Sequence, residues 1–150
     1  MVQSVGSSIL VSKEENIEAA VSRVEDALLG NFDGDWSGGL RRFSNLSVEE
    51  LIGAIEASPE LADMGRWNNF IGLPLLLVEA GKLIEKGLKV SFIGYLVGKG
   101  RSDARLTIEG LCAHSPVADT ATLTLAALRG AQLGADEFEV RGDEVVWWWD

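Results

Sequence analysis

The sequence is poor in cysteine and histidine, and this shortage excludes several kinds of site. Its one cysteine excludes an internal disulfide framework and fits a protein of a reducing compartment. Its one histidine excludes a metal centre built from several imidazole ligands. We therefore predict a fold that depends on its hydrophobic core, with no metal and no cofactor.

Long apolar runs and basic residues are also scarce. Met1-Val2-Gln3-Ser4 lacks the basic residues and the apolar core of a secretory signal, and no apolar run approaches the roughly 20 residues of a membrane span. The chain has 13 basic and 23 acidic residues, and the resulting net charge of -10 repels phosphate backbones. We expect a cytoplasmic protein with neither a nucleic-acid nor a membrane partner.

Apolar residues are abundant enough for one sizeable core. They make up 47% of the chain, and a chain of 150 residues fits a single domain over residues 1–150. Such a domain buries about 70% of its unfolded surface. The composition predicts an ordered globular protein.

Two capping boxes mark helix starts in the first half of the chain. In each box a serine stands three positions before a glutamate, Ser12 before Glu15 and Ser47 before Glu50. Ser8-Ile9-Leu10-Val11, ahead of the first box, fits a short strand or an apolar lead-in. We predict one helix from the first box to Gly30, a shorter helix from the second box to Ser58-Pro59, a short turn from Pro59 to Met64, and a helix that starts near Pro74 and ends at Gly87. The predicted inward residues of the second helix are Val48, Leu51, Ile52 and Ile55. The third helix has an apolar stripe that Leu75 and Val78 widen, so we expect it to be the most buried; the stripe consists of Leu73, Leu76, Leu77, Ala80, Leu83 and Ile84.

The hydrophobic period changes from about 3.6 to 2 at Leu88, which is typical of strands. One hairpin is predicted through the turn at Gly98 to Asp103, and a second from Glu137–Val140 to Val145–Trp149. Between them a helix is predicted to open at Ser115-Pro116, with Val117, Ala121, Leu125 and Leu128 on its inward face. The sequence therefore predicts an α+β fold in which N-terminal helices precede a ββαββ unit and cover an antiparallel sheet.

Three consecutive tryptophans end the last predicted strand. Neighbouring side chains of a strand point to opposite faces, so Trp147 and Trp149 share one face and Trp148 lies on the other. A covered aromatic ring buries roughly 150 to 250 Å². We predict that Trp147 and Trp149 are core residues, and that the strand is a sheet edge at which a second copy covers Trp148.

The segment Asp33-Gly34-Asp35-Trp36-Ser37-Gly38 resembles the first half of an EF-hand calcium loop, with oxygen side chains at alternate positions and a turn glycine. Arg41 and Ser44 occupy the ninth and twelfth positions, where that family supplies ligands. Without the bidentate glutamate of the twelfth position, we interpret Asp33, Asp35 and Ser37 as part of an acidic turn.

Cys112 and His114 lie two residues apart on a predicted strand and are the strongest catalytic candidates. The nearby helix start favours a thiolate. Against this, Cys112 continues the inward set of Leu106, Ile108 and Gly110, where a cysteine acts as a small hydrophobe. We therefore predict a structural role for the thiol.

We predict a binding or assembly protein without catalytic activity, which associates through its sheet and its tryptophan-rich last strand. The predicted partner is a second copy in a homodimer, or another protein, and the predicted binding residues are Trp36, Tyr95 and Trp148. The alternative is a small enzyme or ligand-binding domain with a pocket beside Cys112 and His114, where Glu109 and Tyr95 supply further polar groups. Gly94 and Gly110 then either leave room for a ligand or let a helix approach closely.

Overall fold

The computed structural model describes residues 16–65, 69–98 and 100–150. The predicted strand at Ser8–Val11 and the capping box from Ser12 to Glu15 lie outside these residues. The helix predicted behind that box is present over residues 16–27. Within the described part of the chain, no helix has the length and apolar character needed to cross a bilayer.

The remaining elements follow the predicted order, with one strand added near the start. They are β1 (Leu40–Leu46), α2 (Val48–Ala57), the short 3-10 helix η1 (Pro59–Leu61), α3 (Leu73–Glu85), β2 (Lys89–Val97), β3 (Arg105–His114), α4 (Thr120–Gln132), β4 (Glu137–Arg141) and β5 (Glu144–Trp148). All strand pairs are antiparallel, in the order β1-β2-β3-β5-β4. The predicted α+β fold is confirmed.

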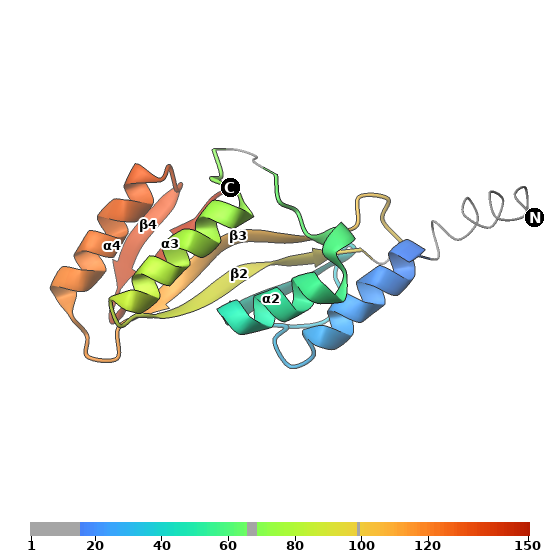
Figure 1. Ribbon diagram of the computed structural model, residues 1–150, viewed down its shortest axis with the longest axis horizontal. Coiled ribbons are helices and arrows are strands. Elements are labelled where there is room, and N and C mark those ends of the chain that lie inside the picture. The colour runs from blue at the N-terminus through green and yellow to red at the C-terminus, as the bar shows by residue number, and fades with distance from the viewer. Residues whose placement is uncertain (1–15, 66–68, 99) are drawn as a thin grey trace, which may run out of the picture.

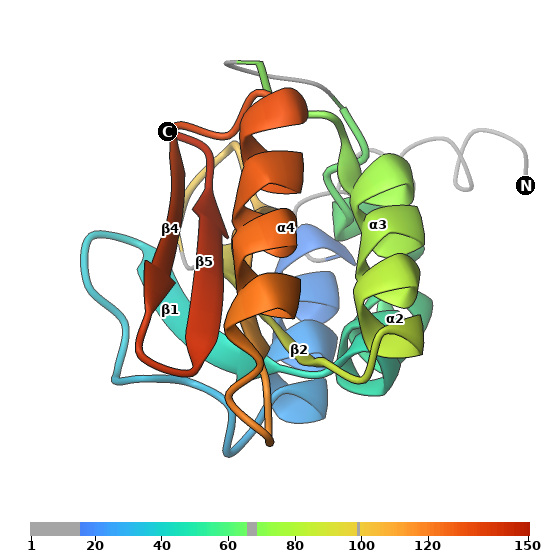
Figure 2. The same ribbon diagram turned by 90° about the vertical axis from the view of Figure 1, so that its left-hand side faces the viewer.

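The helices form a layer on one side of the sheet. Figure 1 shows helix 16–27 and α2 over one end of the strands and α3 and α4 over the other, and Figure 2 shows that the helices share one side. None of the described helices covers the opposite sheet face, which we call the open face. The two faces therefore have different surroundings, and side-chain alternation along each strand decides which residues meet helices.

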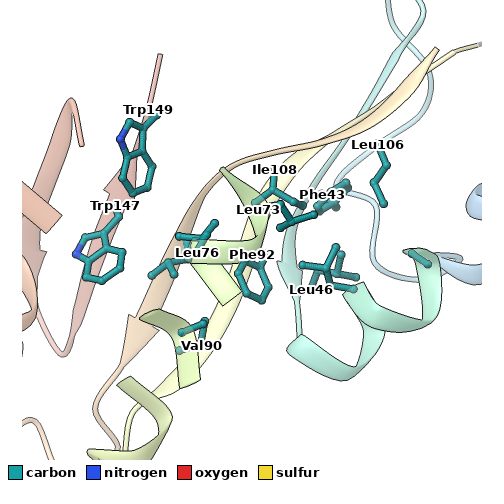
Figure 3. Packing of buried hydrophobic residues seen from close by; sticks show 14 of the residues in the cluster. Phe43, Leu46, Leu73, Leu76, Val90, Phe92, Leu106, Ile108, Trp147 and Trp149 are labelled. Carbon is teal, nitrogen blue, oxygen red and sulfur yellow. The ribbon is translucent and has the colours of Figure 1, made fainter. Parts of the chain in front are cut away.

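The core lies between the sheet and the helix layer. Trp147 and Trp149 are fully buried there, as predicted, and their rings pack edge to face at a centroid distance of 6.5 Å. The Trp147 Nε1 donates a hydrogen bond to the Ala126 carbonyl at 2.9 Å, which ties β5 to α4. Figure 3 shows both indoles on one side of their strand, with Leu76 and Phe92 among the core side chains around them.

The prediction that the last strand is a sheet edge is wrong. β5 lies between β3 and β4, with Cys112 opposite Val146 on one side and Glu139 opposite Val146 on the other. The edges are β1 and β4. Alternation along one strand determines its faces but not its neighbours, so the aromatic pattern at residues 147–149 carried no information on strand order.

A β-bulge in β3 reverses the predicted face of Cys112. Ile93 pairs with Gly110 and Gly94 pairs with Ile108, which leaves Glu109 as an extra residue in β3. An extra residue shifts the alternation by one position. Leu111 is therefore inward and Cys112 lies on the open face, contrary to the prediction.

Gly94 and Gly110 allow close contact between neighbouring strands at this bulge, and they do not make room for a ligand or a helix. A Cβ at Gly94 would overlap the Thr107 carbonyl oxygen, and one at Gly110 would overlap the Trp147 carbonyl oxygen. Both glycines therefore let neighbouring backbones approach closely.

The capping box at Ser47 and Glu50 is confirmed, and α2 ends at Ala57 as predicted. The inward faces were predicted less well. In α3, the predicted inward residues Leu73, Leu76, Ala80 and Leu83 are buried. Ile52 of α2 and Leu75, Val78 and Ile84 of α3 are exposed, although the sequence placed them inside.

The α4 helix starts later than predicted and turns a different face inward. Asp119, not Ser115, is its N-cap and accepts hydrogen bonds from the Ala121 and Thr122 amides. The inward residues are Leu123, Ala126 and Gly130, whereas the predicted inward residues Val117, Leu125 and Leu128 are exposed. Apolar residues occupy two stripes of this helix, so periodicity alone selected the wrong one.

Candidate functional site

The open face carries a strip of mostly uncharged side chains across the central strands. Its members, placed by the strand register, are Ile93 and Tyr95 of β2, Thr107 and Cys112 of β3, and Val146 and Trp148 of β5. Ile93, Thr107 and Val146 are buried, and Tyr95, Cys112 and Trp148 are half-buried. A half-buried tyrosine and tryptophan on one face are typical of contact surfaces.

Trp148 is held in place at its polar end. Its indole Nε1 donates to the Asp150 Oδ1 at 2.7 Å, and the Asp150 amide donates to the Asp136 Oδ2 at 2.7 Å. The ring therefore presents its apolar surface on the open face while its N–H is satisfied. A fixed aromatic side chain loses little conformational freedom when a partner covers it.

The two lateral edges of the open face differ in charge. On the β4 side, the sequence from Asp136 to Asp150 contains six carboxylates and one basic residue, Arg141, which pairs with Glu139. On the β1 side, Arg42 pairs with Asp33 at 2.7 Å, and in the central strand β3 Arg105 pairs with Asp103 at 2.9 Å. The β4 side is therefore strongly negative, whereas arginines balance the carboxylates on the β1 side.

Cys112 and His114 share the open face but do not form a thiol–imidazole pair. The Cys112 Sγ donates to the Glu144 Oε2 at 3.0 Å, and the His114 Nε2 lies 3.1 Å from the Asp143 Oδ2. Burial, and then the hydrogen bond to Glu144, raise the pKa of the Cys112 thiol to about 12. A nucleophilic cysteine needs a lowered pKa, so these surroundings oppose thiolate chemistry.

Glu109 places a carboxyl group within this mostly uncharged strip. The bulge places it beside Gly110, and burial raises the pKa of its carboxyl above the ordinary value despite the field of Arg105. Burying a charged carboxylate under a partner protein costs free energy. This cost is smaller when the Glu109 carboxyl is protonated or paired with a cation.

In the loop that resembles half of an EF-hand, the Asp33 carboxylate binds side chains of the protein itself. Asp33 accepts hydrogen bonds from the Arg42 guanidinium at 2.7 Å and from the Ser44 hydroxyl at 2.9 Å. The Arg41 side chain donates to the Gly34 carbonyl at 2.9 Å. The ninth and twelfth positions thus close the turn against β1. Among the described residues, no cluster of three or more His, Cys, Asp and Glu side chains is arranged for a metal ion.

Trp36 lies apart from Tyr95 and Trp148. It belongs to the loop before β1, and its Nε1 donates to the Glu25 Oε2 at 2.6 Å. There it lines a half-open cavity of about 760 Å³ between helix 16–27 and the turn after β2, together with Ile17, Val21, Arg101 and Ala104. The structure therefore brings two of the three predicted binding residues to one face and places the third at another site.

Several residues of the open face are not among the site residues predicted from the sequence. The position of Val146 on this face could have been predicted from side-chain alternation, because Val146 stands two residues before Trp148 on the same strand. Arg105 also followed from alternation, because it precedes the inward residue Leu106. Arg42 could not be placed, because the strand β1 was not predicted and only its pairing with β2 brings Arg42 to this face.

No protein-family model, curated protein or solved structure matches this chain. Function therefore rests on the geometry of the site itself.

Proposed function

We propose that this protein is a non-catalytic assembly protein that forms a homodimer by stacking the open faces of two copies. The observation that carries the proposal is the open face itself, where Tyr95 and Trp148 belong to a mostly uncharged strip that no described helix covers. Two such faces pack about 10 Å apart in a β-sandwich. The high pKa of Cys112 speaks against the alternative of an enzyme built around this thiol.

Charge favours one orientation of the two copies. A two-fold axis parallel to the strands places β4 of each copy over β1 of the other, so the acidic side meets the side that carries Arg42. An axis across the strands places β4 over β4 and brings like charges together, which is unfavourable. Either two-fold axis gives a closed dimer, so charge is the feature that separates the two orientations.

Sedimentation velocity over a wide concentration range tests the proposal. We expect a dimer at micromolar concentration that Trp148→Ala weakens by at least about tenfold, because an aromatic anchor at the centre of an interface carries much of its energy. The matched control is Leu125→Ala, an exposed residue of α4 in the helix layer, which should leave the dimer unchanged. A wild-type protein that stays monomeric at high micromolar concentration would rule out the proposal.

A further inference from the structure

The outer surface of α4 does not match the rest of the protein surface. Charged residues make up 24% of the chain, yet the thirteen residues of α4 include only one, Arg129. Leu125 and Leu128 are 60% and 55% exposed on this helix. A helix with one face in the core and a second apolar face in solvent is typical of a surface that another element covers.

The facing side of α3 continues this apolar surface. Leu75 and Val78 are 46% and 55% exposed, and Leu75 stands four residues before Glu79 on the same stripe of the helix. Glu79 is the residue that contacts α4, because its two carboxylate oxygens accept from the Arg129 guanidinium at 2.9 and 3.1 Å. Figure 2 shows α3 and α4 side by side. We call the line where they meet the α3–α4 seam.

The seam has an excess of positive charge. The Lys82 ammonium also donates to Glu79, at 3.1 Å, so two cations share one carboxylate. The Glu79 side chain is 8% exposed beneath them, whereas the side chains of Lys82 and Arg129 are 56% and 41% exposed. In a chain with a net charge of -10, this seam therefore offers a cationic centre with two leucines on α4 and two apolar residues on α3 around it.

We propose that the α3–α4 seam binds an acidic amphipathic helix of a partner protein. The partner helix lies over the seam as a third helix, with apolar residues at i, i+4 and i+7 against Leu75, Val78, Leu125 and Leu128. Its carboxylates meet Lys82 and Arg129, whose positive charge Glu79 balances only in part. This surface lies on the helix layer, so it is separate from the open face and does not depend on dimer formation.

Two synthetic peptides test the proposal directly. One is a 15-residue helical peptide with leucine at i, i+4, i+7 and i+11 and glutamate at the flanking positions, and the other carries lysine in place of each glutamate. We expect fluorescence anisotropy to show micromolar binding of the glutamate peptide, at least about tenfold tighter than the lysine peptide. Absence of binding at millimolar peptide, or equal binding of both peptides, would overturn the proposal.

Variants of the full chain locate the binding. Leu128→Ser should weaken the binding of the glutamate peptide at least about tenfold. Lys82→Met should reduce the difference in affinity between the glutamate peptide and the lysine peptide. The matched control is Ile84→Ser, since Ile84 is 45% exposed and lies about 140° around α3 from Glu79, and it should bind like wild type. Equal effects of Leu128→Ser and Ile84→Ser would contradict the proposal. A Leu128→Ser variant that instead dissociates a wild-type dimer would assign the seam to a second copy and would also overturn it.

Discussion

At the scale of single residues, Gly130 has a role that its helix propensity hides. Glycine inside a helix costs about 1 kcal/mol relative to alanine. In α4, however, a Cβ at residue 130 would overlap the Trp147 ring and come within 3.1 Å of the Phe138 Cβ. The missing side chain lets the buried indole lie directly against the helix.

Gly130→Ala should therefore lower the free energy of unfolding by about 1 to 3 kcal/mol, because overpacking a core outweighs the gain in helix propensity. The control is Gly81→Ala in α3, where an added Cβ meets no atom within 4 Å. That change should raise stability by up to about 1 kcal/mol. Urea denaturation of both variants checks the prediction, which fails if both changes have the same sign.

Cys112 should react slowly in the folded protein even though it is half-buried rather than core. A thiol pKa of about 12 leaves very little thiolate at neutral pH. We expect alkylation by iodoacetamide at pH 7 to be at least about a hundredfold slower than in the urea-unfolded chain. Glu144→Gln should accelerate the reaction, because it removes the carboxylate that accepts from the thiol. Rapid modification of the wild type would revive a chemical role for Cys112.

The same thiol links stability to alkaline pH. Its pKa is raised from 9.0 in the unfolded chain, so the native state holds the proton longer than the unfolded state does. The contribution of this thiol to the free energy of unfolding is fully present below about pH 9 and is lost as the pH rises toward 12.

At the scale of elements, the pair of Glu79 and Arg129 is the described polar link between α3 and α4. The hydrogen bonds from Arg129, and then from Lys82, hold the pKa of the Glu79 carboxyl below its ordinary value of 4.5. A lowered pKa means that the native state resists protonation. The stability from this link is therefore present above about pH 4.5 and is lost as pH falls through the lowered value.

Arg129→Met should remove this link while keeping the aliphatic stem. We expect a loss of about 1 to 3 kcal/mol at pH 7, the range for a hydrogen bond to a charged group. The loss should shrink as Glu79 is protonated in acid. Thermal unfolding of wild type and variant at pH 7 and pH 3 checks this, and a loss that is equal at both pH values would contradict it.

Sequence patterns predicted most elements but not the face of every residue. The box at Ser47 and Glu50 and the alternation at Trp147 and Trp149 depend on neighbours along the chain, and both are confirmed. The face of Cys112 depends on one unpaired residue in β3, and a bulge has no certain local signature. In α4, Leu125 and Leu123 belong to two apolar stripes, and only tertiary packing decides between them.

At the scale of the whole molecule, the proposed dimer makes a prediction about the sign of a charge effect. Glu137 and Glu139 lie on the edge strand β4, and both side chains are exposed. Replacing both by lysine would bring positive charge to the β1 side of the other copy, which carries Arg42, in the proposed orientation. We therefore expect Glu137→Lys combined with Glu139→Lys to weaken the dimer in sedimentation. The orientation with β4 over β4 predicts the opposite, because the change would relieve repulsion between like charges.

The position of β5 in the middle of the sheet also affects how the protein is made. A ribosome delivers the chain from its N-terminus, so β3 has no neighbour on this side until residues 144–148 have emerged. Until then β4 cannot join the sheet, and the surfaces of β3 and α4 that Trp147 later covers stay open to water. Long-range strand pairing of this kind folds slowly and leaves unpaired strands exposed to aggregation. During synthesis, this chain should therefore depend on chaperones until its last strand is inserted.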